Sequence, residues 1–340
     1  MNVGESFRFP PDKWEDREKL RKLSWLSVVM LLIAATITGL TAGQSQAMKT
    51  AWISDFLTSV PAMALLVSLR YELRAPSERF PEGYSRAISV AFLVTAIVLS
   101  MFGLYLLFDS VMKLVHRQHP PIGSVVLFGH QLWLGWVMIG ALFVSLLIGF
   151  GLGKLKVPVA ERLQSKALHA EAVMNRAEWM SEGAAIIGIT LVAFGLWWGD
   201  AAAAAFISVE IIRDGWKNVR QVIADLMDES PTKLGEQELE PLPRRLRDEA
   251  RQRRWVKNAA VRVREHGHTL TGEVFVVPLR DSMSAEELID ASGALAADLE
   301  RIDWRLHGLM VVPVHALEET SPPRVPPRDE RGIESRDAAD

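Results

Sequence analysis

The stretch Ala51-Trp-Ile-Ser-Asp55-Phe-Leu-Thr-Ser-Val-Pro-Ala-Met-Ala-Leu-Leu-Val-Ser-Leu69 holds a single charged residue, Asp55, among mostly apolar side chains. A helix that crosses a bilayer needs about 20 mainly apolar residues, so this stretch predicts a membrane helix. A bare carboxylate in hydrocarbon costs about 3 kcal/mol on insertion scales. Asp55 is therefore a candidate functional residue, and the rest of the chain is interpreted around it.

Five other segments resemble this one in length and apolar character. The last two are short, but each reaches spanning length if the fifth begins near Ala172 and the sixth continues to about Val222. Six transmembrane helices are therefore predicted. In chain order the apolar segments are Ser24–Gly43, Met48–Leu69, Val90–Asp109, Val125–Gly149, Gly183–Trp198 and Ala201–Ile212.

Lys and Arg residues concentrate in alternate connections between these segments. Six lie between residues 8 and 22, four between 70 and 86, and five between 154 and 176, whereas the third connection has only Lys113 and Arg117. Cytoplasmic loops carry the excess of Lys and Arg, so both termini are predicted to be cytoplasmic. The expected location is the cell membrane, which is the inner membrane in a Gram-negative cell.

Composition divides the chain in two. The long apolar runs precede residue 215, and most clusters of Pro, Arg and Glu follow it. We expect a cytoplasmic segment at 1–23, a membrane domain at 24–225, a linker at 226–240, a soluble domain at 241–316 and a disordered tail at 317–340. The absence of cysteine excludes thiolate metal sites and disulfides, and the net charge of -3 argues only weakly against nucleic-acid binding.

The soluble part alternates helical and strand-like patterns. Apolar residues at four-residue spacing predict a first helix, and Ser284-Ala-Glu-Glu is a capping box that opens a second. The simplest assembly is a cytoplasmic α+β domain of order αββαβ. Its predicted elements are the helix Pro241–Lys257, the strands Val261–Arg264 and Glu273–Val277, a helix from Ser284 to about Ile302, and the strand Leu309–Val314.

Three fragments together resemble the cation diffusion facilitator family. They are Phe80-Pro-Glu-Gly-Tyr-Ser-Arg86 before the third helix, Asp200-Ala-Ala-Ala with Ile212-Arg-Asp-Gly-Trp-Lys-Asn-Val-Arg220 in the sixth, and Leu226-Met-Asp-Glu-Ser-Pro231 after it. The resemblance covers roughly residues 20 to 315. It implies a homodimeric transporter, not an enzyme, that exports a divalent metal cation across the lipid bilayer in exchange for protons and needs no resident cofactor.

The family's transport site, carried over residue by residue, is Asp55 and Ser59 on helix two with Glu178 and Glu182 on helix five. Residues four apart share one helix face, so each pair can point toward the other helix. Here serine replaces one carboxylate, glutamates fill both positions of the second pair, and no imidazole is present. Oxygen-only ligands suit harder ions than zinc, so Mn²⁺ or Fe²⁺ is preferred, while Co²⁺, Zn²⁺ and Mg²⁺ remain candidates.

Other interpretations remain open at this point. Glu178 and Glu182 could be solvated cytoplasmic residues before helix five, and Ser59 could be a small packing residue. A non-transporting relative of the family, acting as a metal sensor or structural membrane protein, is the main alternative function. A membrane enzyme with a carboxylate-held metal ranks last, because no nucleophile or soluble catalytic motif is visible.

Histidines supply weaker candidates. His130 is expected within the fourth helix, where a packing or hydrogen-bonding role is more usual than an ion contact. His266 and His268 lie on a predicted turn, with His307 near the last strand. The resemblance implies regulatory metal binding in this domain, and the competing interpretation is that these loop side chains are solvated.

Overall fold

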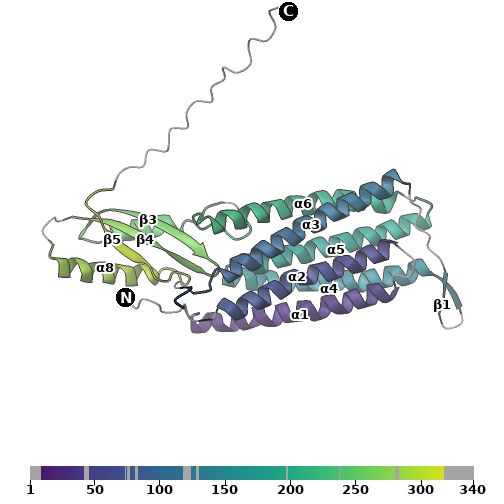
Figure 1. Ribbon diagram of the computed structural model, residues 1–340, viewed down its shortest axis with the longest axis horizontal. Helices are drawn as coiled ribbons and strands as arrows, with labels where there is room; N and C mark the ends of the chain where they lie inside the picture. Colours follow the sequence, from purple (N-terminus) through teal and green to yellow (C-terminus); the bar gives the residue numbers. More distant parts are fainter. Residues whose placement is uncertain are drawn as a thin grey trace, which may run out of the picture.

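The computed structural model describes residues 9–41, 46–72, 74, 77–80, 83–117, 124–127, 130–196, 198–236, 238–279 and 283–317. Six long helices lie side by side, and a small sheet with further helices lies beyond one end of them (Figure 1). The β1–β2 hairpin lies at the opposite end (Figure 1). Apart from residue 317, the predicted tail 317–340 falls outside the described residues.

Each predicted apolar segment overlaps a longer helix, but the fifth was wrong at its end, because that helix stops at Ala193. Backbone hydrogen bonds can continue through polar residues at either end, so helices extend beyond their apolar parts. The first helix begins at a proline, which is favoured in the first turn because its missing N–H has no helical acceptor there. The helices are α1 (Pro11–Thr41), α2 (Gln46–Glu72), α3 (Ala87–Val115), α4 (Leu134–Leu163), α5 (Lys166–Ala193) and α6 (Gly199–Leu226).

The fourth predicted segment was wrong at its start. Residues Ser124–Leu127 (β1) and His130–Trp133 (β2) form an antiparallel hairpin, and α4 begins only at Leu134. His130 therefore lies in a strand and not in the fourth helix. An apolar run does not distinguish a buried strand from a helix by itself, and the β-branched pair at 125–126 suits a strand.

Large apolar side chains face outward around the bundle. Phe108, Trp136 and Phe206 are 66%, 66% and 80% exposed. Among the described residues, α1, α3 and α4 are long and apolar enough to cross a membrane by length and composition. A soluble protein rarely exposes such a continuous apolar surface, so the bundle requires an apolar solvent.

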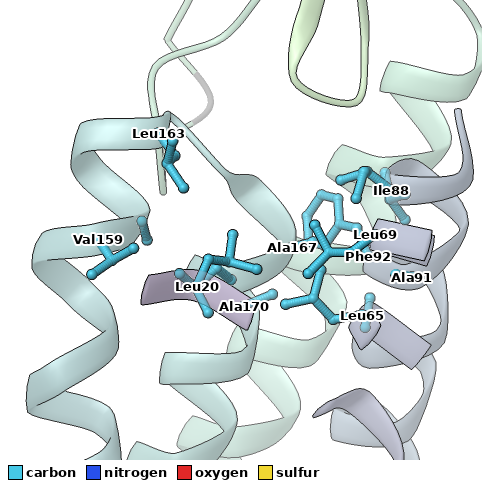
Figure 2. Close-up of a cluster of buried hydrophobic side chains, with 14 of the residues drawn as sticks. Leu20, Leu65, Leu69, Ile88, Ala91, Phe92, Val159, Leu163, Ala167 and Ala170 are labelled. Atoms are coloured by element: carbon cyan, nitrogen blue, oxygen red, sulfur yellow. The ribbon is translucent and has the colours of Figure 1, made fainter. Parts of the chain in front are cut away.

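The helices meet in a buried apolar cluster near the end that faces the sheet. Small side chains such as Ala160 and Ala167 let the helix backbones approach closely there. Figure 2 shows part of this cluster, with Leu20 of α1, Leu65 and Leu69 of α2, Ile88, Ala91 and Phe92 of α3, Val159 and Leu163 of α4, and Ala167 and Ala170 of α5. Within the bundle α2 packs against α5, so side chains on their facing sides lie between the two helices.

The C-terminal elements follow the predicted order. They are α7 (Leu242–Arg251), β3 (Val256–His266), β4 (Thr269–Pro278), α8 (Ala285–Glu300) and β5 (Met310–Pro313). Strand β3 pairs antiparallel with β4, and β4 pairs parallel with β5. The capping box at Ser284 is confirmed by its reciprocal hydrogen bonds with Glu287.

The first helix of this region is shorter than predicted. It ends at Arg251, and Val256 and Lys257 belong to β3 instead. Val256 and Ala259 are buried against Leu246 in the core between helix and sheet. That long-range burial favours the strand over continuation of the helix, and it cannot be derived from local helical periodicity.

Buried polar contacts join the sheet region to the bundle. His268 Nδ1 lies 2.7 Å from Glu72 Oε1 at the end of α2, and His266 Nε2 lies 2.8 Å from an Arg86 nitrogen. Both imidazoles are buried. The interpretation of these two histidines as solvated loop residues is therefore wrong, because β3 and β4 place their turn directly against the bundle.

Candidate metal centre

Two helices supply the carboxylates of the predicted site. Asp55 lies on α2, and Glu178 and Glu182 lie one turn apart on α5. Residues four apart on a helix share a face, so the two glutamates project toward the same side. Because α2 and α5 are in contact, that side faces Asp55.

The three carboxylates converge. One ligand oxygen from each of Asp55, Glu178 and Glu182 lies within 4.8 Å of the others. Their residues are 2%, 2% and 6% exposed. The interpretation of the glutamates as solvated residues before helix five is therefore wrong, because α5 begins at Lys166 and carries both of them inside the bundle.

Neighbouring side chains donate hydrogen bonds to two of the carboxylates. The Thr38 hydroxyl of α1 donates to Asp55 Oδ2 at 2.6 Å. The Thr58 hydroxyl of α2 donates to Glu178 Oε1 at 2.8 Å, and the Asn175 amide donates to Glu178 Oε2 at 3.5 Å. Hydroxyl and amide donors of this kind orient carboxylates around a metal ion.

Glu182 is different from the other two carboxylates. Both of its oxygens are buried, and neither has a hydrogen-bond partner within the described part of the chain. A buried carboxylate without a partner carries a large desolvation cost. Such a cost is expected at a site where a cation supplies the missing partner.

Two buried serines are candidate neutral ligands, and the structure treats them differently. The Ser59 hydroxyl is buried and donates to the Phe56 carbonyl of its own helix at 2.7 Å, so its role as a ligand stays a prediction. Ser145 of α4 faces Asp55 and Glu182, although its hydroxyl makes no hydrogen bond of normal geometry within the described residues. Ser145 thus places a neutral oxygen beside the carboxylates.

Sequence reasoning missed the residues that surround the carboxylates. Thr58 and Asn175 lie three positions from Asp55 and Glu178, so helical spacing could have suggested them. Thr38 and Ser145 come from other helices and have no such signal. Their placement depends on how four helices pack together.

The arrangement is chemically suited to a hard divalent cation. It offers up to three carboxylates and neutral hydroxyl oxygens, with no imidazole among the grouped ligands of the described residues and no cysteine in the chain. Oxygen ligands suit Mg²⁺ and Mn²⁺, whereas Zn²⁺ favours nitrogen and sulfur. Three ionised carboxylates so close together also repel one another strongly, so a cation or protons must balance them.

Comparison with known proteins agrees with this geometry. Residues 23–227 match the transmembrane domain of the cation efflux family. The chain belongs to this family. As a cation efflux family member it is a multi-spanning membrane protein and a transporter rather than an enzyme, and the membrane-enzyme alternative is set aside.

Several curated relatives are distantly similar to this cation efflux family member. The manganese efflux system protein MneS of Bacillus subtilis (strain 168) is 22% identical over 64% of this chain and 71% of its own length. An uncharacterized transporter of Methanocaldococcus jannaschii is 23% identical over 47% of this chain and 52% of its own. A cadmium, cobalt and zinc/H(+)-K(+) antiporter of Bacillus velezensis is 20% identical over 63% and 64%.

Proposed function

We propose that this cation efflux family member exports a divalent metal cation from the cytoplasm through a site formed by Asp55, Ser59, Glu178 and Glu182. The observation that carries the proposal is the convergence of three buried carboxylates from α2 and α5. The two Glu182 oxygens, which have no hydrogen-bond partner among the described residues, support it further. Intramembrane carboxylates that face the interior of a bundle commonly mark ion pathways.

We favour Mn²⁺ or Fe²⁺ as the transported ion. The ligand oxygens are harder than the nitrogen and sulfur atoms that zinc prefers. The similarity to a manganese efflux protein supports the same choice. Co²⁺, Zn²⁺ and Mg²⁺ remain in the test set, because carboxylates also bind zinc and the third relative is named for cadmium, cobalt and zinc.

The proposed coupling is an exchange of the cation for protons. When the ion leaves, crowded carboxylates favour proton uptake because protonation relieves their mutual repulsion. Rocking of the helices would expose the site first to one side of the membrane and then to the other. In this scheme all six helices span the cell membrane with both termini in the cytoplasm, and the sheet region contributes to a homodimer.

Flux in proteoliposomes tests the proposal. Purified protein is reconstituted with an imposed pH gradient, and Mn²⁺, Fe²⁺ (without oxygen), Co²⁺, Zn²⁺ and Mg²⁺ are compared by stopped-flow fluorescence. We expect saturable flux of at least one ion, reduced to the protein-free background by Asp55→Asn. Collapse of the pH gradient with an ionophore should slow the flux, and an interior pH dye should report counter-movement of protons.

Ser68→Ala is the matched control, because Ser68 is a buried polar residue of α2 whose hydroxyl bonds to Leu65 within its own helix. It should transport like the wild type. Flat traces for every metal, from wild-type protein shown to be folded, would instead favour the non-transporting sensor or structural role.

A further inference from the structure

A lysine is completely buried inside the bundle beside the proposed site. Lys156 of α4 is 0% exposed, and its ammonium lies 2.6 Å from Glu171 Oε1 and 2.6 Å from Asn175 Oδ1, both on α5. Removing an ammonium from water costs several kcal/mol unless strong partners replace the water. A packing role alone needs no charge there, so the contacts of Lys156 merit a functional explanation.

The lysine determines which way the Asn175 amide points. An ammonium only donates hydrogen bonds, so the Asn175 oxygen must face Lys156. The amide NH₂ is then turned toward Glu178 Oε2, 3.5 Å away. The reverse orientation would place two sets of donors against each other and two acceptors against each other, which costs free energy in a buried position.

Glu171 forms an ion pair with the buried lysine and neutralises its charge. With the ion pair between Lys156 and Glu171 in place, the amide is oriented without adding net charge beside a cation site. Thr58 donates to the other oxygen of Glu178. The Glu178 carboxylate is thus approached by one donor at each oxygen, which restricts rotation of its plane.

We propose that Lys156 and Asn175 are positioning residues that hold the Glu178 carboxylate in its cation-binding orientation, with Glu171 as the counter-ion of Lys156. The inference rests on the proposed function of the carboxylate site. Lys156 acts on the orientation of Glu178 through Asn175, and the counter-ion Glu171 limits the effect of the lysine charge on the site. Mutation of a residue that hydrogen-bonds to a metal ligand commonly lowers metal affinity by about 10- to 100-fold, and we expect an effect at the lower end of this range.

A mutant cycle tests this chain of contacts. The first change is Asn175→Leu, which removes the amide but keeps the ion pair. The second is the joint change Lys156→Met and Glu171→Met, which removes both charges and frees the amide to turn. Each should weaken Mn²⁺ binding about 10-fold, and all three changes together should weaken it no more than about 3-fold beyond Asn175→Leu alone.

Binding is measured by electron paramagnetic resonance of free Mn²⁺ over full-length protein in nanodiscs, and the visible spectrum of bound Co²⁺ reports changes in ligand geometry. Thr95→Val is the control, because Thr95 is a buried hydroxyl of α3 bonded to Ala91 within its own helix. Its affinity and spectrum should match the wild type. Melting temperatures of all variants separate loss of folding from loss of positioning.

Two results overturn the inference separately from the proposed function. If the wild type binds Mn²⁺ and Asn175→Leu binds it with the same affinity, the amide has no positioning role. Weakened binding in Asn175→Leu, with wild-type affinity in the variant lacking both charges, would remove the role of Lys156. Wild-type protein that binds none of the metals would overturn the proposed function and this inference together. If the charge-free variant does not fold, Asn175→Leu still decides the role of the amide.

Discussion

At the scale of single residues, the carboxylates are distinguished by their partners. Asp55 and Glu178 receive hydrogen bonds from Thr38 and Thr58, whereas the oxygens of Glu182 have no partner among the described residues. A carboxylate that accepts hydrogen bonds keeps one orientation. A carboxylate without such donors can reorient when an ion binds. In the proposed site, Glu182 is therefore the side chain expected to move most when a cation binds.

Loss of the Thr58 hydroxyl should weaken cation binding without unfolding the protein. Thr58→Val preserves shape but removes the donor to Glu178, and we expect KM for the transported cation to rise about 10-fold. Thr58→Ser keeps the hydroxyl and should restore most of the affinity. Proteoliposome flux at varied metal concentration measures both, and equal KM values for the valine and serine variants would show that the hydrogen bond is irrelevant.

At the scale of helices, close packing of α3 on α6 depends on a glycine. A Cβ added at Gly215 of α6 would lie 2.9 Å from the backbone N and Cα of Ser100 on α3. Membrane helices often use small residues to bring their backbones together in this way. The same glycine lies in the sixth-helix fragment that resembled the family, so packing alone explains a small residue there.

Gly215→Ala should therefore destabilise the bundle, although alanine is the better helix former. Overpacking of this kind costs about 1–3 kcal/mol, because the two helices must separate to make room. Gly151→Ala on α4 is the control, since a Cβ there meets nothing within 4 Å. Melting temperature in detergent should fall for Gly215→Ala only, and an equal fall in both variants would contradict the packing explanation.

At the scale of the whole molecule, a buried charge cluster joins the bundle to the sheet. Lys166 at the start of α5 lies 2.9 Å from Asp225 of α6 and 2.9 Å from Glu265 of β3. Burial raises the pKa of Glu265 to about 7, although Lys166 opposes the shift and Arg305 opposes it more weakly. One cation against two carboxylates leaves an excess of negative charge when Glu265 ionises.

This raised pKa predicts how stability changes with pH. The folded protein holds the Glu265 proton more tightly than the unfolded chain, so the contribution is complete below about pH 4.5 and is lost as pH rises through about 7. The melting temperature of the wild type should therefore fall, relative to Glu265→Gln, between pH 5 and pH 8. Glu229→Gln, at an exposed position after α6, should show no such trend.

Parallel pH profiles for wild type and Glu265→Gln would contradict this assignment of the buried proton. A wild type that gains stability relative to Glu265→Gln as pH rises would also do so, because it would mean that the ionised carboxylate is the form that Lys166 stabilises. Melting in the same detergent at each pH makes the comparison direct.

The sequence by itself determined the approximate helical segments and the order of the C-terminal elements, because these depend on local composition and on residues three or four apart. The resemblance to the family supplied the candidate site positions, and the structure brings Asp55, Glu178 and Glu182 together. Only the tertiary structure decided that Thr58 reaches Glu178 across 120 positions of sequence, or that Lys156 of α4 orients an amide on α5. Likewise, the burial of His266 and His268 depends on contacts with Arg86 and Glu72, far away in the sequence. Such contacts arise from packing of whole helices and strands, which leaves no periodic trace in the residues it brings together.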